Sequence, residues 1–293
     1  MIRCRAVTLP SDRCVIFVHA HPDDEALGTG GTIARYAADG THVCVVTCTN
    51  GELGEIADVP DVGPVSDVRL RLGEVRAAEL VEACRRLGPV DLRLLGFHDS
   101  GMAGTPANDD PKVFINQDLD DAVRKIVAII REIRPQVLVT YNEIGLYGHP
   151  DHIRAHEAAM RAVDAAADAA YGSGRPHRVA KVYFTAVPKS LLKAGRELWG
   201  ELGAGDPDDF FAEEEIDRIA TDDDVITTAI DVAAYVDRKF HALEAHRTQL
   251  GTTERFLAIP EPYRNLAFGT ECYVRVRPIG AEAKETDLFE AIR

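Results

Sequence analysis

Residues 14–25 read CVIFVHAHPDDE, and this stretch decides the fold. Its first part, Cys14 to His19, is almost entirely apolar, which is typical of a strand buried on both faces. Pro22 fits the first turn of a helix, where its missing N–H is not needed, and a helix is predicted over residues 25–38. A buried strand that runs directly into a helix is the opening unit of a parallel α/β sheet.

The same alternation of strand and helix continues along the chain. The predicted strands are 43–49, 92–95 and 137–141, and the predicted helices are 70–87, 119–133 and 152–169. This rhythm predicts an α/β fold with a mostly parallel, Rossmann-like sheet flanked by helices.

After Gly172 the pattern is less regular and predicts a smaller C-terminal α+β extension. Its expected elements are strands at 179–185, 225–230 and 272–276, a helix at 233–246, and a tail from residue 280. We predict one domain over residues 1–293. An α/β core at 1–172 carries the site, and the extension at 173–293 helps to close the substrate pocket.

Composition narrows the class of function. The chain has 293 residues, 46% of them hydrophobic and 28% charged, and no apolar run approaches the roughly 20 residues of a membrane span. The first residues lack the pattern of a signal peptide, so we expect a cytoplasmic protein that binds no membrane. A formal net charge of −15 excludes nucleic acid as an expected partner. Six cysteines without a Cys-x-x-Cys pair are interpreted as small buried hydrophobes.

Two short segments carry the chemistry: His21-Pro22-Asp23-Asp24 and His149-Pro150-Asp151-His152. Each stands where a predicted strand leads into a predicted helix. Because the carboxyl ends of parallel strands meet at one edge of a sheet, the two segments are expected to converge. A catalytic zinc site uses three nitrogen or oxygen ligands and keeps a position open for water. His21, Asp24 and His152 supply that set.

The remaining residues of the segments fit the hydrolysis of an amide. Zinc polarises the carbonyl and lowers the pKa of bound water. Asp23 is then the expected general base, and His149 the expected acid for the departing amine. Asp151 is expected to hold His149 as an imidazolium, and Tyr147 to donate a hydrogen bond to the oxyanion. One His-Pro-Asp alone is most often a helix-capping turn, whereas two at equivalent junctions favour a metal site.

Two other features have competing interpretations. Residues 28–31, GTGG, suggest a dinucleotide loop and thus a non-catalytic nucleotide-binding α/β module. Asp23 and Asp24 occupy the strand end and would repel a pyrophosphate, so close helix packing is the preferred interpretation. His156 follows His152 at the spacing of helical zinc pairs, but the glutamate of a His-Glu-x-x-His motif is absent, and we expect it outside the ligand set.

Two long connections, residues 50–68 and 96–118, are candidate substrate loops. Glu55 lies in the first loop, Asp99 and Met102 lie in the second, and Arg76 lies on the helix between them. Carboxylate and guanidinium groups suit vicinal hydroxyls, although each of these side chains also fits a structural ion pair.

With both motifs in hand, the sequence resembles the LmbE-like (PIG-L) family of zinc-dependent N-deacetylases. The supporting stretches are VTCTNGELGE at 46–55, DSGMAG at 99–104, HRTQ at 246–249 and ETDL at 285–288. The likeness extends through most of the chain. It is strongest to the branch that deacetylates N-acetylglucosaminyl-inositol in mycothiol biosynthesis, which yields glucosaminyl-inositol and acetate.

The resemblance implies one Zn²⁺ per chain, or Fe²⁺ in its place, and a small acylated amino sugar as substrate. It assigns the metal ligands, base, acid and oxyanion donor to the same residues as above. It also implies that Arg76 and Asp99 bind sugar hydroxyls and that Glu55 binds the inositol.

The same family leaves alternatives open. They are a mycothiol S-conjugate amidase and a deacetylase of a natural-product glycoside. Gly28 matches neither the lysine of the amidase nor the serine of the deacetylase, so the room near Gly28 and Met102 is expected to separate them. A homo-oligomer is compatible with the sequence, which leaves the oligomeric state open.

Overall fold

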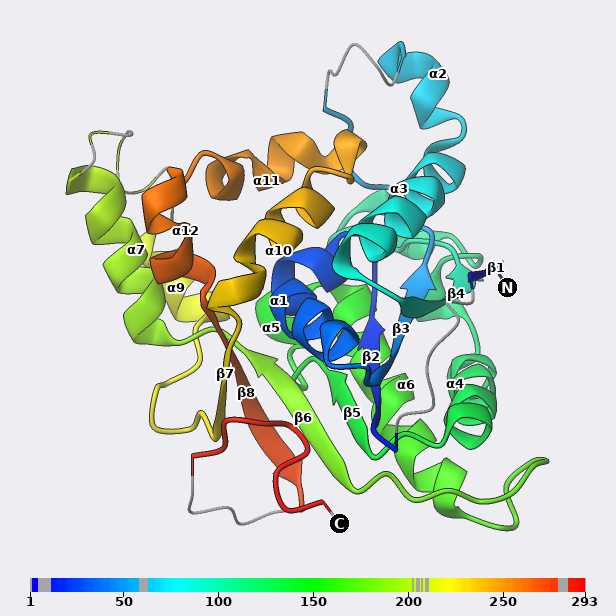
Figure 1. Ribbon diagram of the computed structural model, residues 1–293. Coiled ribbons are helices and arrows are strands. Elements are labelled where there is room, and N and C mark those ends of the chain that lie inside the picture. Colours follow the sequence, from blue (N-terminus) through cyan, green and yellow to red (C-terminus); the bar gives the residue numbers. More distant parts are fainter. Residues whose placement is uncertain are drawn as a thin grey trace.

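The computed structural model describes residues 2–4, 12–57, 63–201, 203, 206, 208, 211–278 and 284–292. Within them, eight strands form one sheet in the order β1-β4-β3-β2-β5-β6-β8-β7 (Figure 1). The strands are β1 (Ile2–Cys4), β2 (Cys14–His19), β3 (His42–Thr49), β4 (Val90–Phe97), β5 (Val137–Thr140), β6 (Lys181–Ala186), β7 (Thr228–Asp231) and β8 (Thr270–Arg277). The central strands β4, β3, β2, β5 and β6 are parallel, while β1, β8 and β7 pair antiparallel, which confirms the predicted α/β class.

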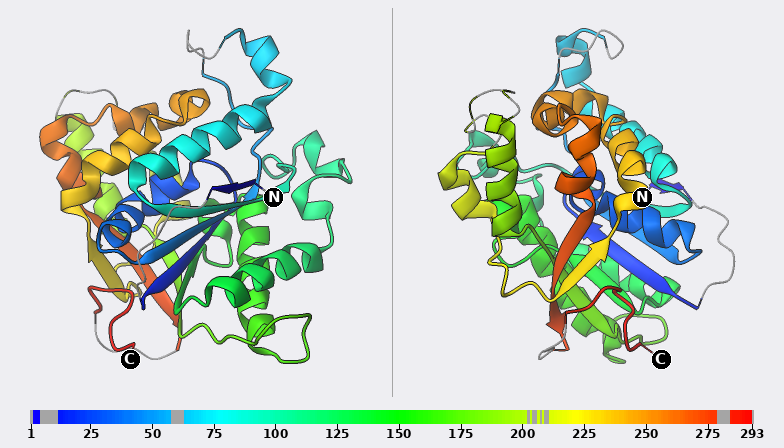
Figure 2. Two further views of the ribbon diagram at one scale, coloured as in Figure 1. Left: turned by 45° about the vertical axis from the view of Figure 1, so that its right-hand side comes forward. Right: turned by 60° about the vertical axis from the view of Figure 1, so that its left-hand side comes forward.

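Helices cover both faces of the sheet, as the views in Figure 2 show. The helices are α1 (Asp24–Ala38), α2 (Val65–Arg69), α3 (Leu72–Leu87), α4 (Leu119–Ile133), α5 (Gly145–Gly148), α6 (Pro150–Ala167), α7 (Lys189–Glu201), α9 (Glu213–Ile219), α10 (Val236–Leu243), α11 (Leu250–Leu257) and α12 (Glu261–Phe268). None of the helices in the described part combines the length and apolar character needed to cross a membrane.

The burial of β2 explains why its sequence is apolar without alternation. Val15 and Phe17 belong to the core under α1, α3 and α10, whereas Ile16 and Val18 belong to the core under α4 and α6. Successive side chains of a strand point to opposite faces, so a strand covered on both sides needs apolar residues throughout.

The connectivity of the sheet places the site. From β2 the chain moves through β3 to β4 in one direction, and later through β5 to β6 in the other. The carboxyl ends of β2 and β5 therefore form the switch point where ligands bind in such sheets. Helix α1 begins just after β2, and α5 and α6 follow β5, so both His-Pro-Asp segments open onto this crevice.

Most predicted helices and strands are present, and several of them begin or end at other residues than predicted. The strand at 14–19 and the helix at 119–133 have the predicted bounds. The helix predicted at 70–87 is α3, which begins two residues later; the separate helix α2 precedes it, and Leu70 between the two is 89% exposed. The helix predicted at 233–246 is a 3₁₀ turn followed by the shorter α10.

The predicted C-terminal tail is wrong for residues 284–292, while residues 280–283 and 293 lie outside the described residues. The Glu285 carboxylate is 4% exposed and accepts hydrogen bonds from Lys181 Nζ and Tyr183 Oη, each at 2.7 Å. Leu288 is fully buried. The partners of Glu285 stand about a hundred residues earlier, on β6.

Gly30 and Gly31 allow close packing of α1 against the C-terminal part of the chain, whereas the prediction was close packing of the helix on the sheet. A Cβ on Gly31 would lie 2.6 Å from Val232 Cγ2, and one on Gly30 would lie 3.2 Å from Lys239 Cγ. Side chains at these two positions would therefore force α1 away from α10.

Candidate active site

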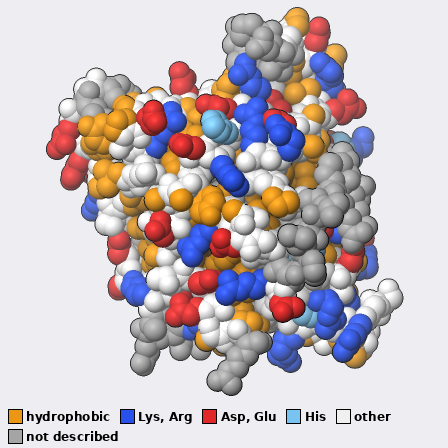
Figure 3. Space-filling model, viewed as in Figure 1, with side chains coloured by type: hydrophobic (Ala, Val, Ile, Leu, Met, Phe, Trp, Pro, Cys, Tyr) orange, Lys and Arg blue, Asp and Glu red, His pale blue; other side chains and the backbone are white. Residues whose placement is uncertain are grey.

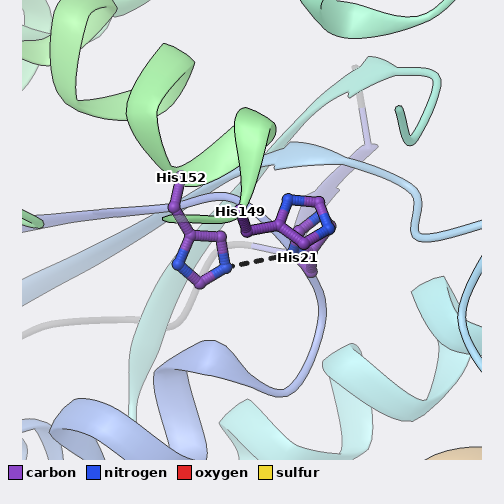
Figure 4. A group of neighbouring side chains, drawn as sticks. All are labelled: His21, His149 and His152. Carbon is purple, nitrogen blue, oxygen red and sulfur yellow. Dashed lines mark hydrogen bonds between the residues drawn. The ribbon is translucent and has the colours of Figure 1, made fainter. Parts of the chain in front are cut away.

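The three predicted metal ligands lie together at the switch point. His21 follows β2, Asp24 is the first residue of α1, and His152 lies in the first turn of α6. Figure 4 shows the rings of His21, His149 and His152 converging from these separate elements.

Their donor atoms have the separations of a metal site. His21 Nδ1 lies 3.3 Å from His152 Nε2 and 3.6 Å from an Asp24 carboxylate oxygen, and His152 Nε2 lies 3.5 Å from the other oxygen. Tetrahedral coordination with bonds of about 2.1 Å separates ligand atoms by roughly 3.4 Å. These separations, which involve a different Asp24 oxygen for each histidine, are compatible with the predicted ligand set.

Asp151 orients His21, and this differs from the role that the sequence predicts. Its carboxylate lies 3.1 Å from His21 Nε2 and accepts hydrogen bonds from Ser100 N at 2.9 Å and Ser100 Oγ at 2.5 Å. Because a carboxylate only accepts, His21 carries its proton on Nε2, which leaves the Nδ1 lone pair for a metal. The carboxylate of Asp151 was predicted to bind a His149 imidazolium; in the structure it binds the ring of His21.

The carboxylate of Asp24, the third predicted ligand, is oriented by Tyr141, a residue that the sequence analysis did not single out. Tyr141 Oη donates to Asp24 at 2.7 Å and accepts from Ala20 N at 2.9 Å. The His21 amide also donates to Asp24, at 2.8 Å. These donors fix the carboxylate beside both histidines.

His149 caps α6 with its own ring. Asp151 N donates to His149 Nδ1 at 3.1 Å, so the neutral ring carries its proton on Nε2. Burial, together with the nearby His21 and His152 rings, lowers the pKa of His149 to about 3. His149 also lies within metal-binding range of the other two histidines. With Nε2 protonated and Nδ1 accepting from the Asp151 amide, the neutral His149 ring has no free lone pair, and Asp24 stays the predicted third ligand.

Asp23 has an unusual backbone conformation. Its φ of 110° is unfavourable for a residue with a side chain, and such strain is frequent at functional sites. Arg76 Nη2 donates to the Asp23 carboxylate at 3.1 Å and to Pro22 O at 2.5 Å. Burial raises the pKa of Asp23 to about 6, although Arg76 opposes that shift. A carboxylate with this pKa suits a general base near neutral pH.

Tyr147 stands at the opposite side of the cluster, in the short helix α5. Its hydroxyl lies 3.4 Å from His152 Nε2. Gly145 and Gly148, with φ of 65° and 89°, allow the turn that brings it there. Burial raises the pKa of Tyr147 well above its ordinary value, so the hydroxyl keeps its proton and is able to donate.

Comparison with known proteins identifies this arrangement. The family model described as PIG-L, GlcNAc-PI de-N-acetylase, matches residues 16–163. A 1D-myo-inositol 2-acetamido-2-deoxy-α-D-glucopyranoside deacetylase from Thermomonospora curvata is 45% identical over 96% of this chain and 98% of its own. The enzyme of the same name from Geodermatophilus obscurus is 46% identical over 97% and 99%. The chain belongs to the PIG-L family.

Solved structures share the fold. The conserved protein TT1542 from Thermus thermophilus is 25% identical, with a TM-score of 0.57 over 91% of this chain and 96% of its own. The N,N'-diacetylchitobiose deacetylase from Pyrococcus horikoshii shares the fold, with 18% identity and a TM-score of 0.57 over 90% and 83%. The predicted resemblance is thus confirmed, and the chain is a metal-dependent PIG-L hydrolase that removes acetyl groups from nitrogen.

A cavity of about 650 Å³ opens above the metal ligands of this PIG-L chain, within the usual size range for small-molecule sites. One end is polar and contains the ligands, Asp23 and Tyr147. The other end is lined by apolar side chains from α7, α11 and α12 and the residue before α9: Leu191, Leu192, Leu198, Phe211, Phe256, Leu266 and Phe268. Figure 3 shows hydrophobic side chains gathered over the α7 and α12 region at its upper left. The C-terminal extension thus supplies the apolar half of the cavity.

The four predicted substrate contacts all line the cavity but differ in their freedom to bind a ligand. Glu55 is exposed, and Met102 is 46% exposed. Asp99 is buried, accepts from Gly101 N at 2.8 Å, and lies 3.7 Å from His21 Nε2. Arg76 is nearly fully buried, with its terminal nitrogens bound to Pro22, Asp23 and Gly51. Arg76 therefore positions Asp23, and its terminal nitrogens are engaged with protein groups instead of facing open space in the cavity.

Two further residues of the site were not predicted. Glu25 and His246 are both fully buried and form a hydrogen bond of 2.7 Å between Oε1 and Nε2. They are 221 residues apart, so no local spacing could have paired them. His156, by contrast, bonds Tyr141 O at 2.9 Å through Nδ1 and lies outside the ligand set, as expected.

Proposed function

We propose that the chain hydrolyses the acetamide of 1D-myo-inositol 2-acetamido-2-deoxy-α-D-glucopyranoside to glucosaminyl-inositol and acetate, a step of mycothiol biosynthesis. Whole-length relatives at about 45% identity that carry this activity in their names support the substrate. The observation that carries the chemistry is the His21, Asp24 and His152 cluster with the Asp23 carboxylate beside it.

His21, Asp24 and His152 would hold the metal, for which we propose Zn²⁺ with Fe²⁺ as the alternative. A divalent cation bound there polarises the amide carbonyl and makes a water molecule a better nucleophile at neutral pH. A mixed set of two imidazoles and one carboxylate accepts either ion, and availability then decides between them.

Asp23 takes the proton from the attacking water. Arg76 holds one oxygen of its carboxylate at 3.1 Å, which leaves the other available for that proton. We further propose that Asp23 passes the proton to the departing nitrogen. The alternative acid, His149, would need a second proton on Nδ1, where the Asp151 amide already donates.

His149 and Tyr147 then both act on the oxyanion. The Nε2–H of His149 and the hydroxyl of Tyr147 are donors on buried groups beside the ligands, and such donors stabilise charge that develops on a carbonyl oxygen. Asp99 and Glu55 are the proposed contacts for sugar and inositol hydroxyls.

The test is release of amine from the named pseudo-disaccharide by metal-reconstituted protein. Turnover that is lost in Asp23→Asn, with the metal still bound, supports the proposal. Bound metal without turnover by the wild-type protein would reject this substrate.

A second candidate, amide hydrolysis of a mycothiol S-conjugate, is favoured by one observation. A Cβ placed on Gly28 has no atom within 4 Å, and the cavity continues past this position along apolar residues of the C-terminal helices. The pocket thus has space for a bulky substituent. The ratio of kcat/KM for the conjugate and the acetamide, measured in parallel, decides between the two activities.

A further inference from the structure

A buried pair lies directly behind the general base. His246 stands at the junction of α10 and the following 3₁₀ turn, and its Nε2 lies 2.7 Å from Glu25 Oε1, with neither side chain exposed. Because a carboxylate only accepts, His246 donates this bond. Its Nδ1 has no hydrogen-bond partner within the described part of the chain. The contact with Glu25 is therefore the polar interaction that the ring makes.

The second oxygen of Glu25 acts on Asp23. Oε2 accepts a hydrogen bond from the Asp23 amide at 3.0 Å. This amide belongs to the residue whose φ is 110°, a conformation that relaxes unless its surroundings hold it. Glu25 thus holds the peptide of Asp23, while Arg76 holds its carboxylate.

His246 in turn fixes Glu25. Without His246, Oε1 of the fully buried Glu25 carboxylate would have no donor, and only the Asp23 amide would still bond the other oxygen; a buried charge satisfied at one oxygen alone is unfavourable. Without the imidazole donor, the Glu25 side chain would turn away from its present position to find water. The Asp23 amide would then lose its acceptor, and the strained residue would be held by Arg76 and by its carbonyl, which accepts from Ala26 N and Leu27 N at 3.0 Å each.

We propose that His246 is a positioning residue for the general base, acting through Glu25 on the backbone of Asp23. This inference rests on the proposed role of Asp23. It assigns to the C-terminal extension a part in catalysis beyond lining the pocket, because the acceptor of the Asp23 amide is held by a donor supplied from position 246.

The experiment compares His246→Gln with His246→Asn. The amide nitrogen of glutamine reaches the position of imidazole Nε2, whereas that of asparagine is too short, so the two variants differ in reach but not in polarity. We expect His246→Gln to keep kcat within about threefold. We expect His246→Asn to lose about 10- to 100-fold in kcat, the size of effect that a small misplacement of a catalytic group produces.

Three further readouts separate positioning from a general structural role. In His246→Asn, KM and metal affinity, the latter measured by chelator competition, should stay within about twofold of wild type. In an Asp23→Asn background the same substitution should cost no more than about twofold, because the group being positioned is already disabled. Equal losses in both backgrounds, or equal kcat for the two His246 variants, would overturn the inference.

Crystal structures of the two variants give an answer that does not depend on the substrate. We expect the Asp23 φ to stay near its present value in His246→Gln and to relax in His246→Asn. An unchanged Asp23 in His246→Asn would overturn the inference. If wild-type protein fails to hydrolyse the sugar, the proposed function fails, and the Asp23 conformation still decides this point.

Discussion

His21 Nε2 lies 3.1 Å from the carboxylate of Asp151, a residue one position before another metal ligand, His152. The two His-Pro-Asp segments are therefore joined through a hydrogen bond as well as through the cation they would share. An acidic partner on the far nitrogen fixes the tautomer of a ligating imidazole and raises its basicity.

Replacing Asp151 by Asn should weaken metal binding. We expect a 10- to 100-fold loss of affinity, the usual effect of removing such a partner, measured by competition with a chelator. Ser100→Ala removes the 2.5 Å bond to the same carboxylate and the acceptor of Ile115 N, and it is the milder companion variant because Ser100 N still donates to Asp151. Undiminished affinity together with a large loss of kcat would mean that Asp151 acts on His149 instead.

His149→Gln should lower kcat without changing the shape of the pH profile. Loss of one oxyanion donor reduces kcat by roughly 10²- to 10³-fold. Because the ring is assigned as a neutral donor, the limb at high pH should remain in the variant. Disappearance of that limb in a plot of kcat/KM against pH would show that His149 is the acid after all.

Tyr141→Phe and Tyr147→Phe form a pair with opposite expected effects. The first removes the 2.7 Å donor to Asp24 and the acceptor of Ala20 N, so metal affinity should fall about tenfold and stability by about 1–3 kcal/mol. The second should lower kcat while leaving metal affinity unchanged. Titration with zinc and urea unfolding measure both quantities, and a reversed pattern would exchange the two assignments.

The stability of the metal-free protein should depend on pH through Asp91. Burial alone would raise its pKa, but hydrogen bonds from His42 and Arg93 lower the pKa of Asp91 to about 2. The folded-state pKa is below the unfolded value of about 3.9, so this stabilisation is present above pH 4 and is lost as the pH falls towards 2. Urea unfolding of wild type and Asp91→Asn should differ by about 1–2 kcal/mol at pH 6. A gap of the same size at pH 2.5 would contradict the assignment.

The fold and the convergence of the two His-Pro-Asp segments were predictable because both depend on local patterns. The buried strand at 14–19 and the helix after it indicate the α/β class. Two similar motifs at strand ends come together when their strands are parallel neighbours, as β2 and β5 are. The orientation of Asp151 was not predictable. Asp151 is close to His149 in the sequence, but its carboxylate accepts a hydrogen bond from Ser100, which lies 51 residues earlier in a loop.

Other parts of the site depend on contacts that no periodicity encodes. His246 forms a hydrogen bond with Glu25, 221 residues away in the sequence, and Glu285 accepts one from Lys181, 104 residues away. A lone histidine or a charged residue near a chain end has no sequence signal for such partners. Arg76 was expected to face the sugar because its chemistry suits hydroxyls, yet three groups of the protein already occupy it.

The proposed metal ligands stand on opposite sides of the switch point: His21 and Asp24 follow β2, and His152 follows β5, which pairs directly with β2. The two histidines are 131 residues apart in the sequence, so they come together only when β2 and β5 pair. Capture of a cation with full affinity therefore reports that the central strands have joined. Time-resolved metal uptake during refolding would date this event directly, without a spectroscopic label in the sheet.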